Sequence, residues 1–279
     1  MRLNRMPLLF VLFAFLLPGC AMFQKMIEKP DVEFKNLSMQ EMSLFQGTLV
    51  FHFAVTNPNA IDLPANELTY DLKIDGRPFI NGKLDKGIQL PAKKTEMVAI
   101  PVKIEYASFF SSLAEIFKKE SIAYDLTGTF GKFGLSVPFQ TKGTLPVPKL
   151  PKISVKEVNV ENLSFKGAAL DVLVEMENEN GFPVPLKGFD YVLSLGGKKI
   201  AQSRADTKQP LSGKGKSSIK IPVNLDFFEM GQAAANLLNN SRSDYELTGA
   251  MRLDVPGKGE ERFDYSMKGE APFTRSSSF

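Results

Sequence analysis

The sequence predicts a mainly β protein: two tandem immunoglobulin- or fibronectin-III-like β-sandwiches, each with one short α-helix. Two observations predict this fold class. The chain repeats itself in a single register, and each copy contains segments in which apolar and polar residues alternate with a period of two, as in strands with one buried face. About seven such strands in roughly 110–120 residues is the pattern of an immunoglobulin-like sandwich.

The first element, residues 1–19, has the features of a bacterial export signal. Arg2 and Arg5 form a positively charged start, and residues 6–17 are an unbroken apolar run. A transmembrane helix needs roughly 20 apolar residues, so this run is too short to span a bilayer. We therefore interpret residues 1–19 as a cleaved signal peptide.

The signal ends in Leu17-Pro18-Gly19-Cys20, which resembles the lipobox of bacterial lipoproteins. Pro18 departs from the commoner Ala or Ser, and an ordinary secretory signal is the alternative. Cys20 is the only cysteine of the chain and stands where the peptidase chemistry requires it. We expect lipidation of Cys20, a mature chain that begins there, and attachment to a membrane through the acyl chains.

The tether, residues 20–30, connects this anchor to the folded part. No aspartate follows Cys20, which resembles outer-membrane sorting, so the periplasmic face of the outer membrane is favoured over the inner membrane. Without Arg2 and Arg5 the basic residues number 32 against 31 acidic ones. Because nucleic-acid binding relies on an excess of basic residues, nucleic acid is not expected as a partner. We expect a monomer without cofactors.

The internal repeat defines the domains. Four motifs recur 121 residues later without a gap, and the register changes only at an insertion around residues 255–259. The first copy covers 31–148 and the second 153–273, while 274–279 is expected to be a disordered tail. The paired motifs are Asn57-Pro58-Asn59 with Asn178-Glu179-Asn180, Tyr70-Asp71-Leu72 with Tyr191-Val192-Leu193, Ile100-Pro101-Val102 with Ile221-Pro222-Val223, and Tyr124-Asp125-Leu126-Thr127-Gly128 with Tyr245-Glu246-Leu247-Thr248-Gly249.

Within each copy the pattern predicts strands, hairpins and one helix. Phe51, Phe53 and Val55 form an inward series, repeated by Val172, Val174 and Met176. Asp75-Gly76 and Gly196-Gly197 are two-residue hairpin signals. Amphipathic spacing predicts short helices over 108–119 and 228–239. Between the copies, residues 145–151 contain three prolines, which favours a semi-rigid extended linker. Its last part, residues 149–152, lies between the two predicted domains.

Together these motifs resemble the group-2 late embryogenesis abundant domain (LEA type 2, or WHy). The resemblance rests on the Asn-Pro-Asn turn, the Leu-x-Tyr-x-Leu-x-Ile strand ending in Asp-Gly, the Ile-Pro-Val strand and the Tyr-x-Leu-x-Gly strand. The second copy departs at Glu179, where this family prefers Pro. The resemblance implies a folded β-sandwich linked to desiccation and stress, and it carries over no catalytic residue.

Asn57, Pro58, Asn59, Asn178 and Asn180 are interpreted as a structural turn motif. Asparagine side chains bond their own backbone and tolerate left-handed conformations. No other motif indicates chemistry: the sequence contains no GxSxG, phosphate loop or HExxH pattern.

Candidate metal ligands are few, and no metal site is predicted. His52 is the only histidine, on the outward side of its strand, and one ligand cannot build a zinc site. Four acidic residues share an outward face in the second copy, so a calcium row is conceivable. A solvated acidic face is the favoured interpretation, because calcium usually also requires loop carbonyls. The four residues are Asp171, Glu175, Glu177 and Glu179.

The equivalent face of the first copy, Val50, His52, Ala54 and Thr56, is much less charged. This asymmetry makes it a candidate docking face for a partner or for the second domain. Shielding by a neighbouring loop is an equally good alternative.

Three classes of function remain. The leading hypothesis is a non-enzymatic, membrane-anchored envelope module that binds or protects other molecules under desiccation or osmotic stress. The runner-up is a lipid or apolar-ligand carrier, in which the repeated helix would cover a cavity between the sheets. A hydrolase is the least supported, since it would need a cleft with perturbed titrating groups. Under the leading hypothesis, the expected partners are the membrane, through the acylated Cys20, and envelope proteins or lipid.

Overall fold

The computed structural model describes residues 27–275 apart from 66, 85–87, 107–112, 132–135, 208 and 231–239. At residues 65, 229 and 230 it describes the backbone but not the side chains. The predicted signal peptide, Cys20 and most of the tether lie outside the described residues. Two compact units are present. The first contains the chain up to Gln40, Thr48–Val102 and Ser121–Leu145, and the second contains Glu41–Gly47, Lys103–Glu120 and Pro146–Phe279.

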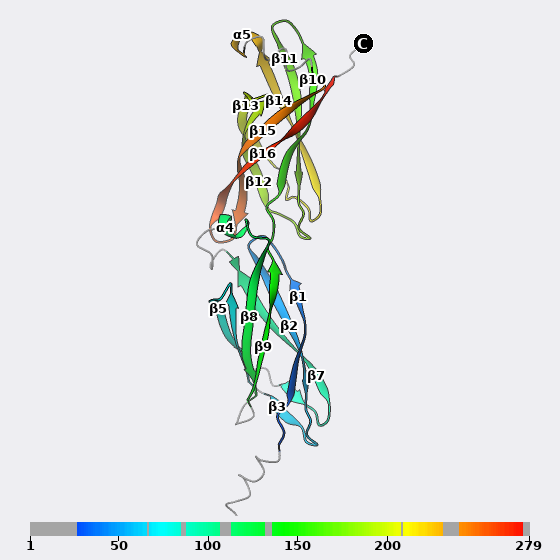
Figure 1. The fold of residues 1–279 in the computed structure, drawn as a ribbon, viewed down its shortest axis with the longest axis vertical. Helices are drawn as coiled ribbons and strands as arrows, with labels where there is room; N and C mark the ends of the chain where they lie inside the picture. The colour runs from blue at the N-terminus through cyan, green and yellow to red at the C-terminus, as the bar shows by residue number, and fades with distance from the viewer. Residues whose placement is uncertain are drawn as a thin grey trace, which may run out of the picture. The chain divides into compact units, whose positions relative to one another are not determined.

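The first copy folds into two main sheets (Figure 1). One has the strand order β1-β2-β7, and the other has the order β5-β4-β8-β9; β3 and β6 form a short ladder of their own. The bounds are β1 Asp31–Gln40, β2 Gln46–Thr56, β3 Leu63–Ala65, β4 Leu68–Ile74, β5 Arg77–Leu84, β6 Ile88–Leu90, β7 Thr95–Glu105, β8 Ser121–Phe130 and β9 Val137–Pro146.

The core of the first copy is aromatic. The predicted inward residues Phe51 and Phe53 of β2 are fully buried and meet rings from the opposite sheet. The ring centroids of Phe51 and Tyr124 lie 5.4 Å apart, and those of Phe53 and Phe139 lie 4.8 Å apart. Because burying one such side chain contributes about 1.5–3 kcal/mol, these rings stabilise the contact between the sheets. The β-sandwich predicted from alternation is confirmed.

In the second copy one continuous sheet supplies both layers. Its strand order is β13-β12-β15-β16-β10-β11-β14. The long strand β16 joins the layers: it pairs antiparallel with β15, and its last residues pair parallel with β10, from Val158↔Phe273 to Val160↔Arg275 (Figure 1). The bounds are β10 Lys152–Leu163, β11 Gly167–Glu177, β12 Leu186–Leu195, β13 Lys198–Asp206, β14 Lys216–Asp226, β15 Arg242–Val255 and β16 Gly259–Arg275.

β16 extends beyond the predicted end of the second copy. Thr274 and Arg275, which the sequence assigned to a disordered tail, belong to this strand because they pair with Asn159 and Val160 of β10. The remainder of that tail, 276–279, lies outside the described residues. The predicted inward series of the second copy is confirmed, since Val172, Val174 and Met176 are buried.

Both predicted hairpins form with the expected turn. Asp75 and Gly76 have φ of 48° and 77°, and Gly196 and Gly197 have φ of 53° and 76°. Two consecutive residues with positive φ make a type I′ turn, whose twist matches that of the flanking strands. These turns set the registers Ile74↔Arg77 and Leu195↔Lys198.

The described helical segments are short. α4 covers Leu113–Ile116 and α5 covers Phe227–Met230. The rest of the predicted helices lies largely in 107–112 and 231–239, outside the described residues. Within the part of the chain that is described, no helix is long and apolar enough to cross a membrane.

Candidate functional site

The Asn-x-Asn motif of each copy is the most highly connected polar group in the described structure. Asn57 and Asn178 are 0% and 1% exposed. Asn57 Nδ2 donates to the carbonyls of Ile61 and Leu90, both at 2.8 Å. Asn178 Nδ2 donates to those of Phe182 at 2.8 Å and Leu211 at 3.2 Å. The same side chain thus ties together two loops about 33 residues apart in both copies.

The second asparagine of each motif holds the segment that leads into the domain. Asn59 Oδ1 accepts from the Glu28 backbone N–H at 2.9 Å, and its Nδ2 donates to the Glu28 carbonyl at 2.8 Å. Asn180 makes the same pair with Lys149, at 2.9 and 2.7 Å. One amide therefore clamps both polar groups of one residue. We call these the tether clamp, at Glu28, and the linker clamp, at Lys149.

The first asparagine orients the second. Asn57 Oδ1 accepts from the Asn59 N–H and from Asn59 Nδ2, both at 2.9 Å. Asn178 Oδ1 accepts from Asn180 in the same way, at 2.9 and 2.8 Å. Because a buried polar group without a partner costs about 1–3 kcal/mol, this mutual satisfaction is what permits four asparagines to be buried.

The predicted turn role of the asparagines is therefore only part of their function. The left-handed residues at this end are Lys93 and Lys214, with φ of 56° and 54°. Each lysine ammonium donates to the carbonyl of the middle residue of the motif, Pro58 or Glu179. Since only that carbonyl is used, the change from Pro58 to Glu179 leaves the arrangement intact.

The predicted docking face on β2 is only partly exposed, with Val50 and Ala54 buried and His52 and Thr56 half-buried, and docking there stays a prediction. Val50 and Ala54 are 6% and 5% exposed. His52 Nε2 bonds Ser38 Oγ at 3.0 Å, and Thr56 Oγ1 bonds that of Thr95 at 2.8 Å. The reason is topological: β2 is the central strand of its sheet, so β1 and β7 flank its small outward side chains on both sides.

The acidic row of the second copy is an ion-pair face. Lys216 lies 2.9 Å from Glu175 and 3.3 Å from Glu177, and Lys220 lies 3.4 Å from Asp171. Glu179 pairs with Lys152. The hydrogen bond from Lys216 lowers the pKa of Glu175, and that from Lys152 lowers the pKa of Glu179. Within the described ranges no group of three or more His, Cys, Asp and Glu residues is arranged to hold a metal.

Sequence reasoning missed a buried arginine on β15. Arg252 is 4% exposed and pairs with Asp206, while its Nε lies 3.5 Å from Asp190. The hydrogen bond from Arg252 lowers the pKa of Asp206. Gly131 occupies the equivalent position of the first copy, so this cluster is specific to the second. Alternation gave no signal, because Arg252 falls in the outward polar series of β15 together with Asp244 and Glu246.

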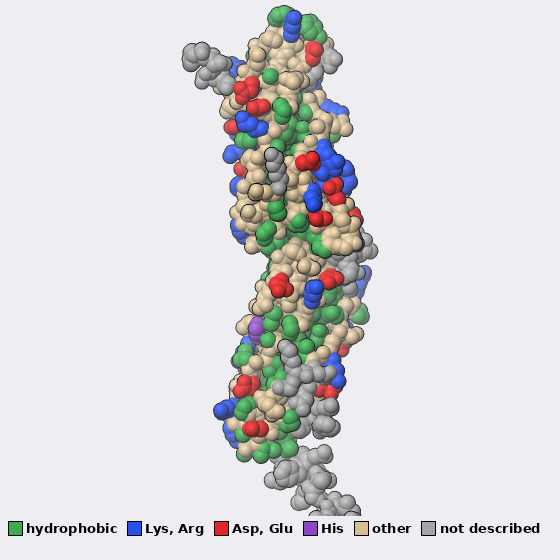
Figure 2. All heavy atoms as spheres, turned by 180° about the vertical axis from the view of Figure 1, so that it is seen from behind, with side chains coloured by type: hydrophobic (Ala, Val, Ile, Leu, Met, Phe, Trp, Pro, Cys, Tyr) green, Lys and Arg blue, Asp and Glu red, His purple; other side chains and the backbone are tan. Residues whose placement is uncertain are grey.

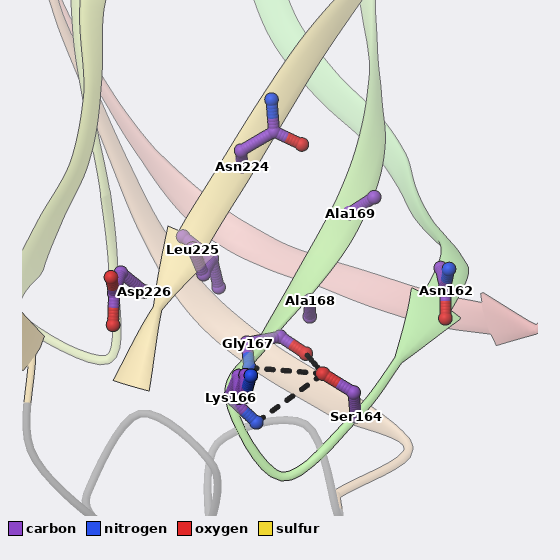
Figure 3. Close-up of a pocket in the computed structure, with 9 residues that line it drawn as sticks. All are labelled: Asn162, Ser164, Lys166, Gly167, Ala168, Ala169, Asn224, Leu225 and Asp226. Atoms are coloured by element: carbon purple, nitrogen blue, oxygen red, sulfur yellow. Dashed lines mark hydrogen bonds between the residues drawn. The ribbon is translucent and has the colours of Figure 1, made fainter. Parts of the chain in front are cut away.

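The β10–β11 hairpin and α5 carry exposed aromatic side chains. Phe165 and Phe228 are 81% and 74% exposed. Figure 3 shows the adjacent shallow pocket of about 410 Å³, where Ser164 Oγ accepts from the backbone N–H groups of Lys166 and Gly167. Lys166 and Asp226 are the charged residues that line it. On the face shown in Figure 2, basic and acidic side chains are intermingled.

Comparisons with known proteins agree with the repeat. The family described as "Late embryogenesis abundant protein" (LEA_2) matches residues 52–143 and again residues 173–269. The late embryogenesis abundant protein Lea14-A of Gossypium hirsutum is 25% identical over 130 residues, which are 47% of this chain and 83% of that protein. The desiccation protectant protein Lea14 homolog of Glycine max is 27% identical over 127 residues, covering 43% and 79%.

Among solved structures, the solution structure of AT1g01470 from Arabidopsis thaliana is similar, with 22% identity and a TM-score of 0.36 over 48% of this chain and 90% of that one. The two family matches lie one in each copy, in the register that the internal repeat defines. The chain belongs to the LEA_2 family of late embryogenesis abundant proteins, of which it contains two tandem domains.

Proposed function

We propose that this protein is a non-enzymatic, lipid-anchored module of the cell envelope that protects other molecules during drying or osmotic stress. The observation that carries the proposal is the pair of family matches, one in each copy, together with relatives named as desiccation protectants.

The anchor in this proposal is Cys20, and the tether clamp limits how far the first sandwich can lie from it. Glu28, the residue that Asn59 holds, lies eight positions after Cys20. An extended chain spans at most about 3.3–3.6 Å per residue, so the first sandwich would begin within roughly 28 Å of the membrane surface. Two or three acyl chains on one cysteine would make this attachment stable.

Localisation is tested with Cys20→Ser. The wild-type chain should incorporate a labelled fatty acid and fractionate with the outer membrane. The variant should carry no label and leave the membrane fraction. A wild-type chain without label, or a variant that stays in the membrane to the same extent, would contradict the anchor.

Protection is tested by comparing survival after drying and after osmotic shock. A deletion strain should survive less well than the parent, and the intact gene should restore survival. Complementation with Cys20→Ser separates the two parts of the proposal: restored survival would mean that protection does not need the anchor. Equal survival of the deletion and parent strains would count against a protective role.

A further inference from the structure

The seam between β13 and β14 is the open edge of the second sandwich. These are the two terminal strands of its seven-stranded sheet, and they come together without forming a ladder (Figure 1). A pocket of about 620 Å³ lies at this seam, within the range of about 300–1,000 Å³ that is usual for small-molecule sites. It opens between the two layers, beside the start of β14.

A comparison of the copies explains why the seam is open. In the first copy β3 and β6 form a ladder of three pairs, from Leu63↔Leu90 to Ala65↔Ile88. The second copy keeps one pair, Val184↔Leu211. The next residue that could pair, Leu186, instead donates its N–H to the Val184 carbonyl at 2.8 Å and joins β12. The strand is thereby drawn away from Gln209, its expected partner.

The floor of the pocket is apolar and the rim is polar but without a free charge. Met176, Leu186 and Leu211 are buried core residues that line the pocket. Ser217 stands opposite Met176 in the ladder of β14 with β11, so it shares the inward face. The hydroxyl and amide groups of the rim come from Thr207, Gln209, Ser212, Ser217 and Ser218.

Both charged lining residues are already neutralised. Lys216 pairs with Glu175 and Glu177, and Asp206 pairs with Arg252. Lys156 also lies 3.7 Å from Glu175, so two ammonium groups balance the two carboxylates and neither ammonium is free to pair with a ligand. An anionic head group would lose hydration at this rim without gaining a free cation, whereas an uncharged head group can bond the hydroxyl and amide groups without that cost.

We propose that this seam binds a single unbranched acyl chain with an uncharged head group, such as that of a monoacylglycerol. The hydrocarbon would enter between the layers over Met176 and Leu211, where the flexible thioether adapts to its shape. The head group would remain at Gln209 and Ser217. This inference goes beyond the proposed protective function and does not depend on it.

The described part of the predicted helix does not lie at this pocket. α5 follows the end of β14, whereas the pocket lies at its start. Phe227 lies ten positions after Ser217, about 33 Å at roughly 3.3 Å per residue. The described part of the helix is therefore not the cover of this pocket.

Photo-crosslinking in envelope membranes that contain the full chain tests the proposal. The probe is a monoacylglycerol with a diazirine in its acyl chain, and a diazirine fatty acid at the same concentration is the anionic comparison. We expect the monoacylglycerol to label peptides containing Met176, Leu211 or Ile219, and to label them several-fold more than the fatty acid. Absence of labelling from these peptides, or stronger labelling by the fatty acid, would overturn the proposal.

Two substitutions at Ser217 locate the site. Ser217→Leu fills the inward face of the seam, and Ser217→Glu introduces the residue that the first copy has at the equivalent position, Glu96. Both should reduce the labelling at least tenfold. Glu96→Leu in the first copy is the matched control and should leave it unchanged. If Ser217→Leu does not fold, as judged by its thermal unfolding, the Glu variant alone decides; unchanged labelling in a folded variant would refute the site.

Discussion

Asn178 offers the sharpest test of what stabilises each sandwich. Asn178→Ala removes the three hydrogen bonds that its Nδ2 donates, to the carbonyls of Phe182, Leu211 and Ser212 at 2.8, 3.2 and 3.0 Å. It also removes the acceptor of the Asn180 N–H. At least two buried polar groups would be left unsatisfied, each at about 1–3 kcal/mol. We expect the second copy to lose about 2–5 kcal/mol of its free energy of unfolding.

The assay must report on each copy separately, because a two-domain chain need not unfold in one step. Hydrogen exchange of the full chain in increasing urea, resolved by peptide, meets this need. Asn57→Ala should cause a similar loss in the first copy. Asn224→Ala, at an exposed position of β14, is the control and should stay within about 0.5 kcal/mol. A loss below 1 kcal/mol for both buried variants would refute the reasoning.

Further predictions concern glycines and pH. Gly249→Ala should destabilise the fold by several kcal/mol, because the added Cβ would lie 1.9 Å from the Asp190 carbonyl oxygen. At Gly76 an added Cβ meets no atom, so Gly76→Ala should cost only about 1–2 kcal/mol for its positive φ. Urea unfolding measures both losses, and equal losses would contradict the steric argument. The lowered pKa of Glu175 means that its pairing with Lys216 stabilises the fold above the ordinary pKa of 4.5 and is lost as the pH falls through the lowered value. The melting temperature should therefore fall less between pH 6 and pH 2 for Lys216→Met than for the wild type. The same dependence of melting temperature on pH in both proteins would show that this ion pair does not contribute to acid destabilisation.

Much of the fold could be predicted because its signals are local or periodic. The alternation at Phe51 and Phe53 follows from one buried face, and the turn at Asp75-Gly76 follows from the residues that tolerate positive φ. Because equivalent positions lie 121 residues apart, each prediction for the first copy also applied to the second. Pairings that depend on distant partners were not visible in this way.

The candidate site shows where such reasoning stops. The asparagines were found, but their partners Glu28 and Lys149 lie 31 residues away and engage through backbone groups that have no sequence signature. Their spacing of 121 residues matches the repeat, but it does not show which groups bond. The burial of Val50 and Ala54 was missed because alternation shows which way a side chain points, and not whether neighbouring strands flank it.

In each of the two clamps a buried asparagine fixes the segment that leads into its sandwich. Amide hydrogen exchange of Glu28 and Lys149, neither of which lies in a strand, measures this. Both amides should exchange slowly, and Asn59→Ala should release Glu28 while leaving Lys149 protected. Fast exchange of both amides in the wild type, or release of both by the single substitution, would contradict the account.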